Sequence, residues 1–122
     1  MLANRAGFAD AACAIFDKAE AGEIRISLCS LSFSNIYYIV RREIGHSATI
    51  DALKELLRVV DILSVDADVV IKSLNSEFKD FEDAIQYYSA EADVAIAGII
   101  TRNPKDFVHS EIPVISPECF LP

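Results

Sequence analysis

Three acidic side chains stand within four positions of the chain, at Asp80, Glu82 and Asp83. A pattern typical of an amphipathic helix follows directly, with apolar residues at positions 81, 84, 85, 88 and 92. Asp80 and Asp83 are three residues apart, so they share one side of that helix near its start. Carboxylate oxygens there could hold a hard divalent cation. Equally, Asp80 could cap the helix while Asp83 acts as a capping-box acid near the positive end of the helix dipole.

Two further polar clusters come directly after predicted strands. Ser30-Leu-Ser-Phe-Ser-Asn35 follows a strand at 23–29, and Thr101-Arg-Asn-Pro-Lys-Asp106 follows a buried strand at 94–100. In open α/β sheets, functional sites form at the carboxyl ends of the strands. Asn35 could instead lie at a helix cap or in a first turn, and Asp106 could cap a turn after Pro104. The sequence therefore leaves both a functional and a structural role open for each.

Strands alternate with helices along the chain. Besides the segments above, the sequence predicts a first helix at 5–21, a serine-rich turn at 30–34, a helix ending at Gly45 and a helix at 48–59. A short strand at 61–65, a helix capped by Asp66, and a strand at 112–116 followed by one helical turn complete the pattern. This alternation favours an α/β fold with a parallel sheet covered by helices on both faces.

The composition narrows the classes of function. The 122-residue chain is 52% hydrophobic, which is typical of a globular protein and sufficient for one domain over residues 1–122. Nineteen acids against eleven bases give a net charge of −8, so the chain is not a general binder of nucleic acid. It could still act on a polyanion if metal ions and a local basic patch screen the site, and its acidity suits a basic protein partner.

Other residues indicate location and exclude some chemistry. Cys13, Cys29 and Cys119 are far apart and odd in number, so we interpret them as small core residues rather than as zinc or disulfide sites. His46 and His109 are interpreted as surface residues in turns. No apolar run approaches the roughly 18 residues that span a bilayer, and the start has no signal-peptide pattern, so we expect a cytoplasmic protein without membrane contact.

Four motifs in a fixed order resemble the PIN domain. They are S-L-S-x-x-N-I-Y-Y from residue 30, D-F-E-D-A-I-Q-Y from residue 80, T-R-N-x-x-D-F from residue 101 and I-P-V-I-S-P-E-x-F-L from residue 112. The resemblance covers nearly the whole chain and is greatest to the VapC-like toxin ribonucleases of toxin–antitoxin modules. It implies a three-layer α/β/α fold and metal-dependent hydrolysis of RNA phosphodiester bonds, with Mg²⁺ or Mn²⁺ as cofactor and an antitoxin protein as possible partner.

The resemblance also implies roles for particular residues. Asp83 falls on the family's helix-borne carboxylate, and Asp80 and Asp106 are the other expected metal ligands. Asn35 and Asn103 stand where many relatives have acids, so the implied catalytic set is Asp83, Asp106, Asn35 and Asn103. Ser30 and Thr101 would be polar neighbours of the substrate, and Arg102 and Lys105 would meet RNA phosphates.

One departure from the family concerns the beginning of the chain. PIN domains open with a central strand ending in Asp, whereas residues 1–8 here resemble the loop that follows it. We expect this strand and its Asp to be missing, with Met1 an internal methionine of a longer frame or a chosen boundary. The chain would then be weak or inactive, and its unpaired inner strand edges would close, either by pairing of strands 24–29 and 94–100 or in a homodimer. A non-catalytic PIN-like interaction module is the alternative.

Aromatic and basic residues leave a further choice open. Tyr37, Tyr38, Tyr87 and Tyr88 could stack on RNA bases, although such aromatics are more often core residues with a polar tip. The Arg41–Arg42 pair fits either a solvated helix face or a contact with RNA or a partner.

Overall fold

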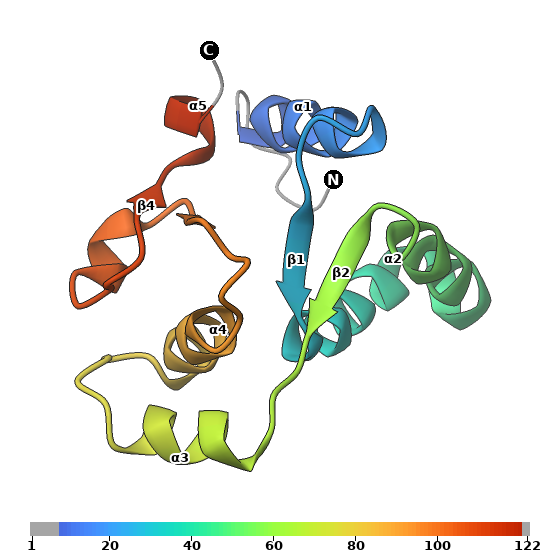
Figure 1. Cartoon of the computed structure of the whole chain (residues 1–122). Helices are drawn as coiled ribbons and strands as arrows, with labels where there is room; N and C mark the ends of the chain where they lie inside the picture. The colour runs from blue at the N-terminus through green and yellow to red at the C-terminus, as the bar shows by residue number, and fades with distance from the viewer. Residues whose placement is uncertain (1–7, 121–122) are drawn as a thin grey trace. The chain divides into compact units, whose positions relative to one another are not determined.

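The computed structural model describes the backbone of residues 8–120 and the side chains of residue 11 and residues 13–120 (Figure 1). The chain divides into two compact units, residues 1–62 and 63–122, and each is described here by itself. Helices and short strands alternate in both units, so the expected α/β class is confirmed. Residues 1–7, on which the expectation of a missing first strand depends, lie outside the described residues. No described helix has the length and apolar character needed to cross a membrane.

In the part of the first unit that the structure describes, residues 8–62, there are two helices and a two-stranded sheet. Helix α1 spans Phe8–Glu20, strand β1 Ile26–Cys29, helix α2 Ser30–Leu56 and strand β2 Val60–Leu63, whose last residue belongs to the second unit. β1 pairs with β2, and the two strands run in the same direction in Figure 1. Every strand and helix predicted for this part of the chain is therefore present, with ends that differ by a few residues.

The serine-rich turn predicted at 30–34 is wrong. Helix α2 begins at Ser30, directly after β1, and its N-cap is Cys29, which makes no side-chain capping bond. Asn35 is consequently the sixth helical residue rather than a cap or first-turn residue. Serine favours turns and caps because its hydroxyl bonds nearby backbone groups, but here the apolar residues between the serines continue the helical spacing and decide the structure.

Gly45 divides α2 into two helical segments. Its backbone has φ 81° and ψ 174°, a conformation essentially restricted to glycine. The hydroxyl of Thr49 donates to the Gly45 carbonyl at 2.6 Å, and Thr49 is fully buried, so this bond fixes the start of the second segment. The break predicted at Gly45 is thus confirmed as a kink, whereas His46, predicted in a turn, already lies in the second helical segment.

The cysteines do not share one environment. Cys29 is buried at the end of β1, as predicted, but Cys13 and Cys119 are exposed, so the core interpretation is wrong for both. Among the described side chains of α1, Ala11 and Ile15 are buried. They are four positions apart, and Cys13, midway between them, falls on the opposite side of the helix.

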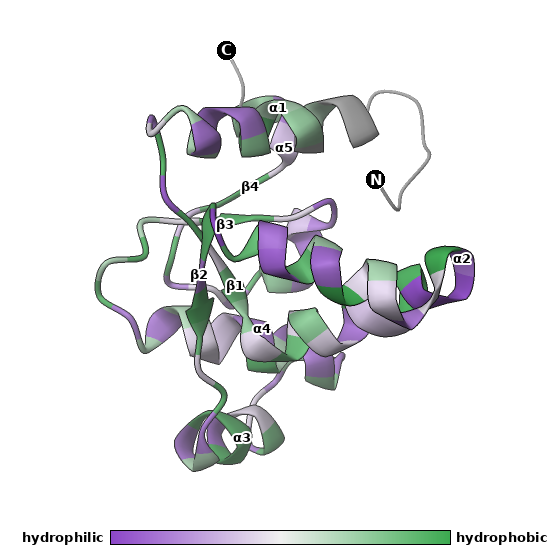
Figure 2. Ribbon diagram, turned by 90° about the vertical axis from the view of Figure 1, so that its right-hand side faces the viewer, coloured by the Kyte–Doolittle hydropathy of each residue, from purple (hydrophilic) through white to green (hydrophobic). Residues whose placement is uncertain are grey.

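The second unit is built on two packed helices. It contains α3 (Ala67–Leu74), α4 (Phe81–Glu91), β3 (Ile99–Ile100), the 3₁₀ turn η1 (Pro104–Phe107), β4 (Val114–Ile115) and α5 (Pro117–Phe120). The carboxylate of Asp66 accepts the Val69 N–H at 3.0 Å and caps α3, as predicted. Hydrophobic and hydrophilic residues alternate around α3 in Figure 2, and its two buried residues, Val69 and Ser73, are four positions apart on one side of the helix. β3 and β4 are parallel, which confirms the expected parallel pairing on a small scale.

The buried strand predicted at 94–100 is wrong over most of its length. Only Ile99–Ile100 is a strand, and Val94 is fully exposed. Asp93 explains the difference, because its carboxylate accepts the Ala95 N–H at 2.9 Å and its carbonyl accepts the Ile96 N–H at 3.1 Å. These local bonds form a turn where the apolar run alone predicts a strand.

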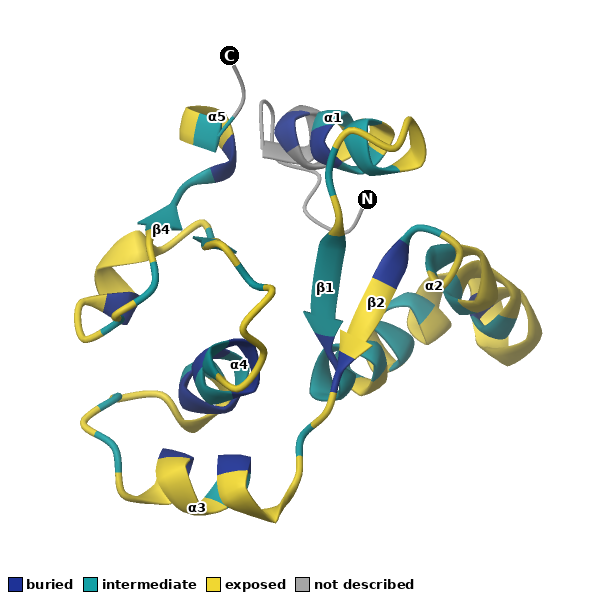
Figure 3. Ribbon diagram, in the orientation of Figure 1, coloured by how far each residue is buried: buried dark blue, intermediate teal, exposed yellow. Residues whose placement is uncertain are grey.

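Helix α4 is the most buried element of the second unit (Figure 3). Its buried residues are Ala84, Ile85, Tyr87, Ser89 and Ala90. The predicted stripe is therefore correct at Ala84 and Ile85, but Tyr88 is only partly buried and the stripe is wrong at both of its ends. Phe81 is 49% exposed, and Ala92, the C-cap of the helix, is exposed as well. The buried side includes Tyr87, whose ring packs against that of Phe78, and α4 also packs against α3 and η1.

The conformation of Gly45 leads to a first prediction. Gly45→Ala should lower the free energy of unfolding by about 1–3 kcal/mol, because a residue with a Cβ rarely adopts this backbone conformation. The cost would come from the backbone alone, since an added Cβ would meet no atom within 4 Å. Urea unfolding followed by circular dichroism measures the change. Ala48→Ser, at an exposed helical position nearby, is the control and should change stability by less than about 0.5 kcal/mol. Equal stability of wild type and Gly45→Ala would contradict the kink.

Candidate functional site

A cavity of about 400 Å³ opens in the second unit where the start of α4 meets η1. Its lining combines three acids of the predicted site with basic and apolar side chains. The lining residues are Glu77, Phe78, Lys79, Asp80, Asp83, Lys105, Asp106, Val108 and His109.

Asp80 and Asp83 have different roles at the start of α4. The Asp80 carboxylate accepts the backbone N–H of Asp83 at 2.9 Å, so Asp80 is the N-cap of the helix. Among the described residues, no hydrogen bond or ion pair engages the Asp83 carboxylate. The capping explanation is therefore confirmed for Asp80, and the Asp83 carboxylate stays available to a ligand in the cavity.

Asp106 is positioned by the 3₁₀ turn η1. Its backbone N–H donates to the Asn103 carbonyl at 3.0 Å, and the neighbouring Phe107 is buried. The Phe107 ring lies 5.8 Å from that of Phe78, and Phe78 lies 5.3 Å from Tyr87 on α4. These rings form an aromatic cluster of Phe78, Tyr87 and Phe107 that holds the segment before α4, the helix itself and η1 together. Since Asp106 lies inside the turn, it is not the turn's cap.

Like charges meet at Asp83. Burial raises the pKa of Asp83 above its ordinary 3.8, and the negative charges of Asp80, Asp106 and Glu82 raise it further, in that order. The Asp106 contribution shows that the acids of α4 and η1 repel each other across the cavity. A bound cation would relieve both the burial penalty and this repulsion.

Tyr87 fixes the chain that leads into β4. Its hydroxyl donates to the Glu91 carboxylate at 3.0 Å and accepts the Glu111 backbone N–H, also at 3.0 Å. Only 2% of Tyr87 is exposed, and burial is the main reason that its pKa is raised above 10.0. The side chain thus joins α4 to the segment between η1 and β4.

The structure brings some of the predicted site residues together and not others. Asp80, Asp83, Lys105 and Asp106 line the cavity described above. Thr101, Arg102 and Asn103 are outside the set of described residues that line it. The Thr101 hydroxyl instead accepts the Asn103 N–H at 3.2 Å and shapes the loop before η1.

The remaining two predicted residues belong to the first unit. Ser30 and Asn35 lie on α2 and are both partly exposed. The site of the second unit is therefore described without them.

Sequence reasoning missed three polar residues of the cavity, Glu77, Lys79 and His109. The signal for Lys79 was its place directly before the capping Asp80. His109 was interpreted correctly as a surface residue, but it also follows Asp106 by three positions and lines the same cavity. Lys79 and Lys105 give the cavity two positive charges beside its acids.

The donors of the cavity suit a hydrated divalent ion better than a closed metal cage. Asp83 and Asp106 offer hard oxygen ligands, and their mutual repulsion favours a cation between them. Within the described part of the chain, no three His, Cys, Asp or Glu residues gather closely enough to hold a metal ion. Mg²⁺ commonly keeps several waters and binds through one or two carboxylates, so the donor set fits a weakly held ion of this kind.

The fold and the acidic cavity agree with the comparison to known families. A PIN domain family model matches residues 1–105, and the chain belongs to this family. Membership implies nuclease activity and nucleic acid binding in general, and PIN domains generally use divalent metal ions. Neither the curated proteins nor the solved structures gave a match.

The raised pKa of Asp83 predicts a stability effect with a definite pH dependence. The folded state holds the Asp83 proton more tightly than the unfolded state, so the penalty is absent well below pH 3.8 and complete above the folded-state pKa. Asp83→Asn should therefore increase the free energy of unfolding at pH 7, and the gain should shrink as the pH falls toward 4. Urea unfolding at several pH values measures this.

The control for this prediction is Glu118→Gln, which removes an exposed acid from α5 outside the cavity lining. Its effect on stability should be small and nearly independent of pH. A loss of stability in Asp83→Asn at pH 7 would contradict the repulsion described above.

Tyr87→Phe should reduce the free energy of unfolding by about 1–3 kcal/mol, because it leaves the Glu111 N–H without its partner and removes the bond to Glu91. Chemical denaturation checks the change. Tyr88→Phe on the same helix is the control and should cost less, since no hydrogen bond of the Tyr88 hydroxyl is described. Equal effects of the two substitutions would count against the role of Tyr87.

Proposed function

We propose that this PIN domain is a metal-dependent ribonuclease that hydrolyses RNA phosphodiester bonds. The observation that supports the proposal is the meeting of Asp83 and Asp106, from α4 and η1, at one cavity that also contains two lysines. Membership of the family implies nuclease activity in general. The cavity contains the acids and lysines that we propose for this activity. Asp83 and Asp106 would hold Mg²⁺ or Mn²⁺, with Asp80 alongside them.

A bound divalent ion would supply an activated water and neutralise charge that develops on the phosphate. The chain's own residues would do the rest. Lys79 and Lys105 attract the RNA backbone to a cavity whose acids would otherwise repel it. Phe78 and Val108 form an apolar wall, and the Asp80 cap keeps the first turn of α4 in place so that the Asp83 carboxylate faces the cavity.

A non-catalytic PIN-like interaction module is the second candidate. It is favoured by the absence of a three-ligand metal cluster from the described residues and by Asn35 and Asn103 at positions where relatives carry acids. Metal binding separates the two candidates. Under this alternative, isothermal titration with Mn²⁺ would detect no binding that depends on Asp83.

We further propose that the protein is the toxin of a toxin–antitoxin pair, by its resemblance to VapC-like ribonucleases. An antitoxin that binds an acidic toxin would carry basic residues, since the net charge of this chain is −8. A homodimer remains part of this proposal, and light scattering during gel filtration tests it. Weak metal binding by two or three oxygen ligands would make the isolated chain a slow enzyme.

Asp83→Asn should lower Mn²⁺-dependent cleavage of a labelled RNA by about 100-fold or more, because the metal is expected to supply several kcal/mol of transition-state stabilisation. The measurement is a gel assay with purified protein, with and without EDTA. Glu82→Gln is the matched control, since Glu82 lies on the same helical turn, is exposed and is not part of the cavity lining. It should keep cleavage within about threefold of wild type.

Cleavage that persists in EDTA, or that is equal in wild type and Asp83→Asn, would contradict the proposed site. The stability measurement on Asp83→Asn excludes unfolding as the cause of a loss of cleavage. A variant that is folded and more stable than wild type at pH 7 cannot lose activity in that way.

A further inference from the structure

We infer that the first segment of α2 carries a second RNA contact, a stacking platform for unpaired bases formed by Tyr37, Tyr38, Arg41 and Arg42. This inference rests on the proposed ribonuclease function and adds to it a contact surface formed by residues that do not line the acidic cavity. The four residues are called the α2 platform below.

Helical spacing places the α2 platform on one side of the helix. Tyr37 and Arg41 are four residues apart, as are Tyr38 and Arg42, so their side chains are neighbours. Glu43 follows Arg41 by two positions and therefore points to a different side of the helix. The platform thus concentrates positive charge on one side of a helix in a chain whose net charge is −8.

The cations of the platform have no acidic partner among the side chains that the structure describes. The ion pairs described there use Lys18, Arg25, Arg58 and Lys72. For residue 11 and residues 13–120, none involves Arg41 or Arg42, and both of these side chains are exposed. Their charge is consequently available to phosphates of a bound strand.

Arg41 is organised by aromatic rings rather than by an acid. Its guanidinium lies 5.9 Å from the ring centre of Tyr37 and 5.7 Å from that of Tyr38. The two rings meet edge to face at 5.1 Å. Such contacts hold the planar guanidinium in place and leave its charge intact, which suits both stacking on a base and binding of a phosphate.

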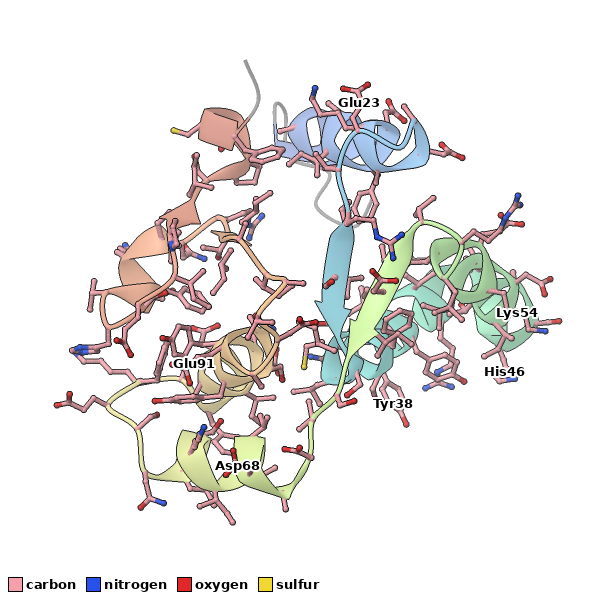
Figure 4. All side chains as sticks on the ribbon, in the orientation of Figure 1. Glu23, Tyr38, His46, Lys54, Asp68 and Glu91 are labelled. Atoms are coloured by element: carbon pink, nitrogen blue, oxygen red, sulfur yellow. The ribbon has the colours of Figure 1, made fainter. Side chains whose placement is uncertain are left out.

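A hydrogen bond across the kink in α2 holds Tyr37 of the platform in place. The Tyr37 hydroxyl and Nδ1 of His46 lie 2.7 Å apart in a hydrogen bond that crosses Gly45, and their rings are 5.7 Å apart. Figure 4 labels Tyr38 and His46 on this helix. Tyr37 is therefore fixed, while Tyr38 remains 57% exposed. The solvent-exposed ring of Tyr38 thus packs against a tyrosine that is already held in place.

A polyanion with exposed base faces is the partner that matches this chemistry. Arginine and tyrosine together bind single strands by charge and by stacking, and stacking accepts any base. In a duplex the base faces are covered, so the platform should favour single-stranded over double-stranded RNA. A surface for a protein partner would show aromatic exposure as well, but it would not require two exposed cations without acidic partners.

Binding of a short fluorescein-labelled oligouridylate to the full chain tests the inference. Fluorescence anisotropy is measured in EDTA and low salt, so that no metal-dependent cleavage occurs. Tyr38→Ala and Arg41→Ala should each weaken binding by about fivefold or more, the loss typical of one stacking contact. Arg58→Ala is the matched control, because Arg58 is an exposed arginine of the same unit that is paired with Glu55. It should change the affinity by less than about twofold.

Arg41→Lys separates stacking from charge. Lysine keeps the positive charge but loses the planar guanidinium, so this variant should lose affinity while the dependence on salt stays that of wild type. Arg41→Ala should also reduce the slope of log affinity against log salt by about 0.7, the value for one phosphate contact on a single strand. These readouts would not move if the residues only stabilised the helix.

The outcomes distinguish this inference from the proposed function. Oligouridylate binding that is unchanged in Tyr38→Ala and Arg41→Ala, or weakened equally by Arg58→Ala, overturns the platform. A change in oligomeric state of Tyr38→Ala with unchanged RNA affinity also overturns it and assigns the surface to protein contact. If the wild-type chain binds RNA through the platform but does not cleave it with Mn²⁺, the platform is supported. Only the proposed ribonuclease function is then contradicted.

Discussion

The packing of Phe78, Tyr87 and Phe107 is the interaction on which the acidic cavity depends. Phe78 precedes the capping Asp80 by two residues, Tyr87 lies in the middle of α4, and Phe107 directly follows Asp106. The ring of Phe78 lies 5.3 Å from that of Tyr87 and 5.8 Å from that of Phe107. This packing brings Asp80 and Asp106, which are far apart in sequence, to one cavity. The Tyr87 hydroxyl extends the same connection to the Glu111 backbone. Apolar and aromatic burial thus provides the free energy that holds repelling carboxylates near each other.

This arrangement has a cost that the sequence alone does not reveal. A helix N-terminus normally favours acids, and both Asp80 and Asp83 occupy favourable positions with respect to the helix dipole. Burial and the neighbouring charges nevertheless raise the pKa of Asp83, so they disfavour the charged form of this carboxylate. Asp80 is satisfied by the Asp83 N–H, whereas the Asp83 carboxylate has no described partner. This difference separates the cap of the helix, Asp80, from the proposed metal ligand, Asp83.

Much of the fold could be predicted because local signals are strong. Asp66 and Asp80 cap α3 and α4 as their spacing indicates, and Gly45 interrupts α2 where it was expected to. The predictions failed where two local signals competed. Ser30 begins a helix rather than a turn, and the side-chain and backbone bonds of Asp93 turn the chain where an apolar run favours a strand.

The site was predictable to the extent that its residues lie near helix starts. Asp80, Asp83 and Asp106 were found from spacing and from the family resemblance, whereas Lys79 and His109 reach the cavity only through packing that no motif encodes. The sequence also does not show which tyrosines are buried and which are exposed. Tyr87 is a core residue with a bonded hydroxyl, and Tyr38 is open to solvent, although both stand in similar aromatic pairs of the sequence.

An acidic protein that acts on RNA through a metal ion needs two kinds of charge. A metal-binding cavity needs carboxylates, and these repel the phosphates of the same substrate unless a cation is present. Lys79 and Lys105 line the same cavity, where the neighbouring carboxylates weaken the attraction of these lysines for a phosphate. Arg41, on the first segment of α2, contacts tyrosine rings, and no ion pair is described for it, so its charge is not weakened in this way. The aromatic contacts of Arg41 thus preserve a positive charge that an acidic partner would neutralise, so a cation–π arrangement suits the RNA contact proposed for this chain of net charge −8.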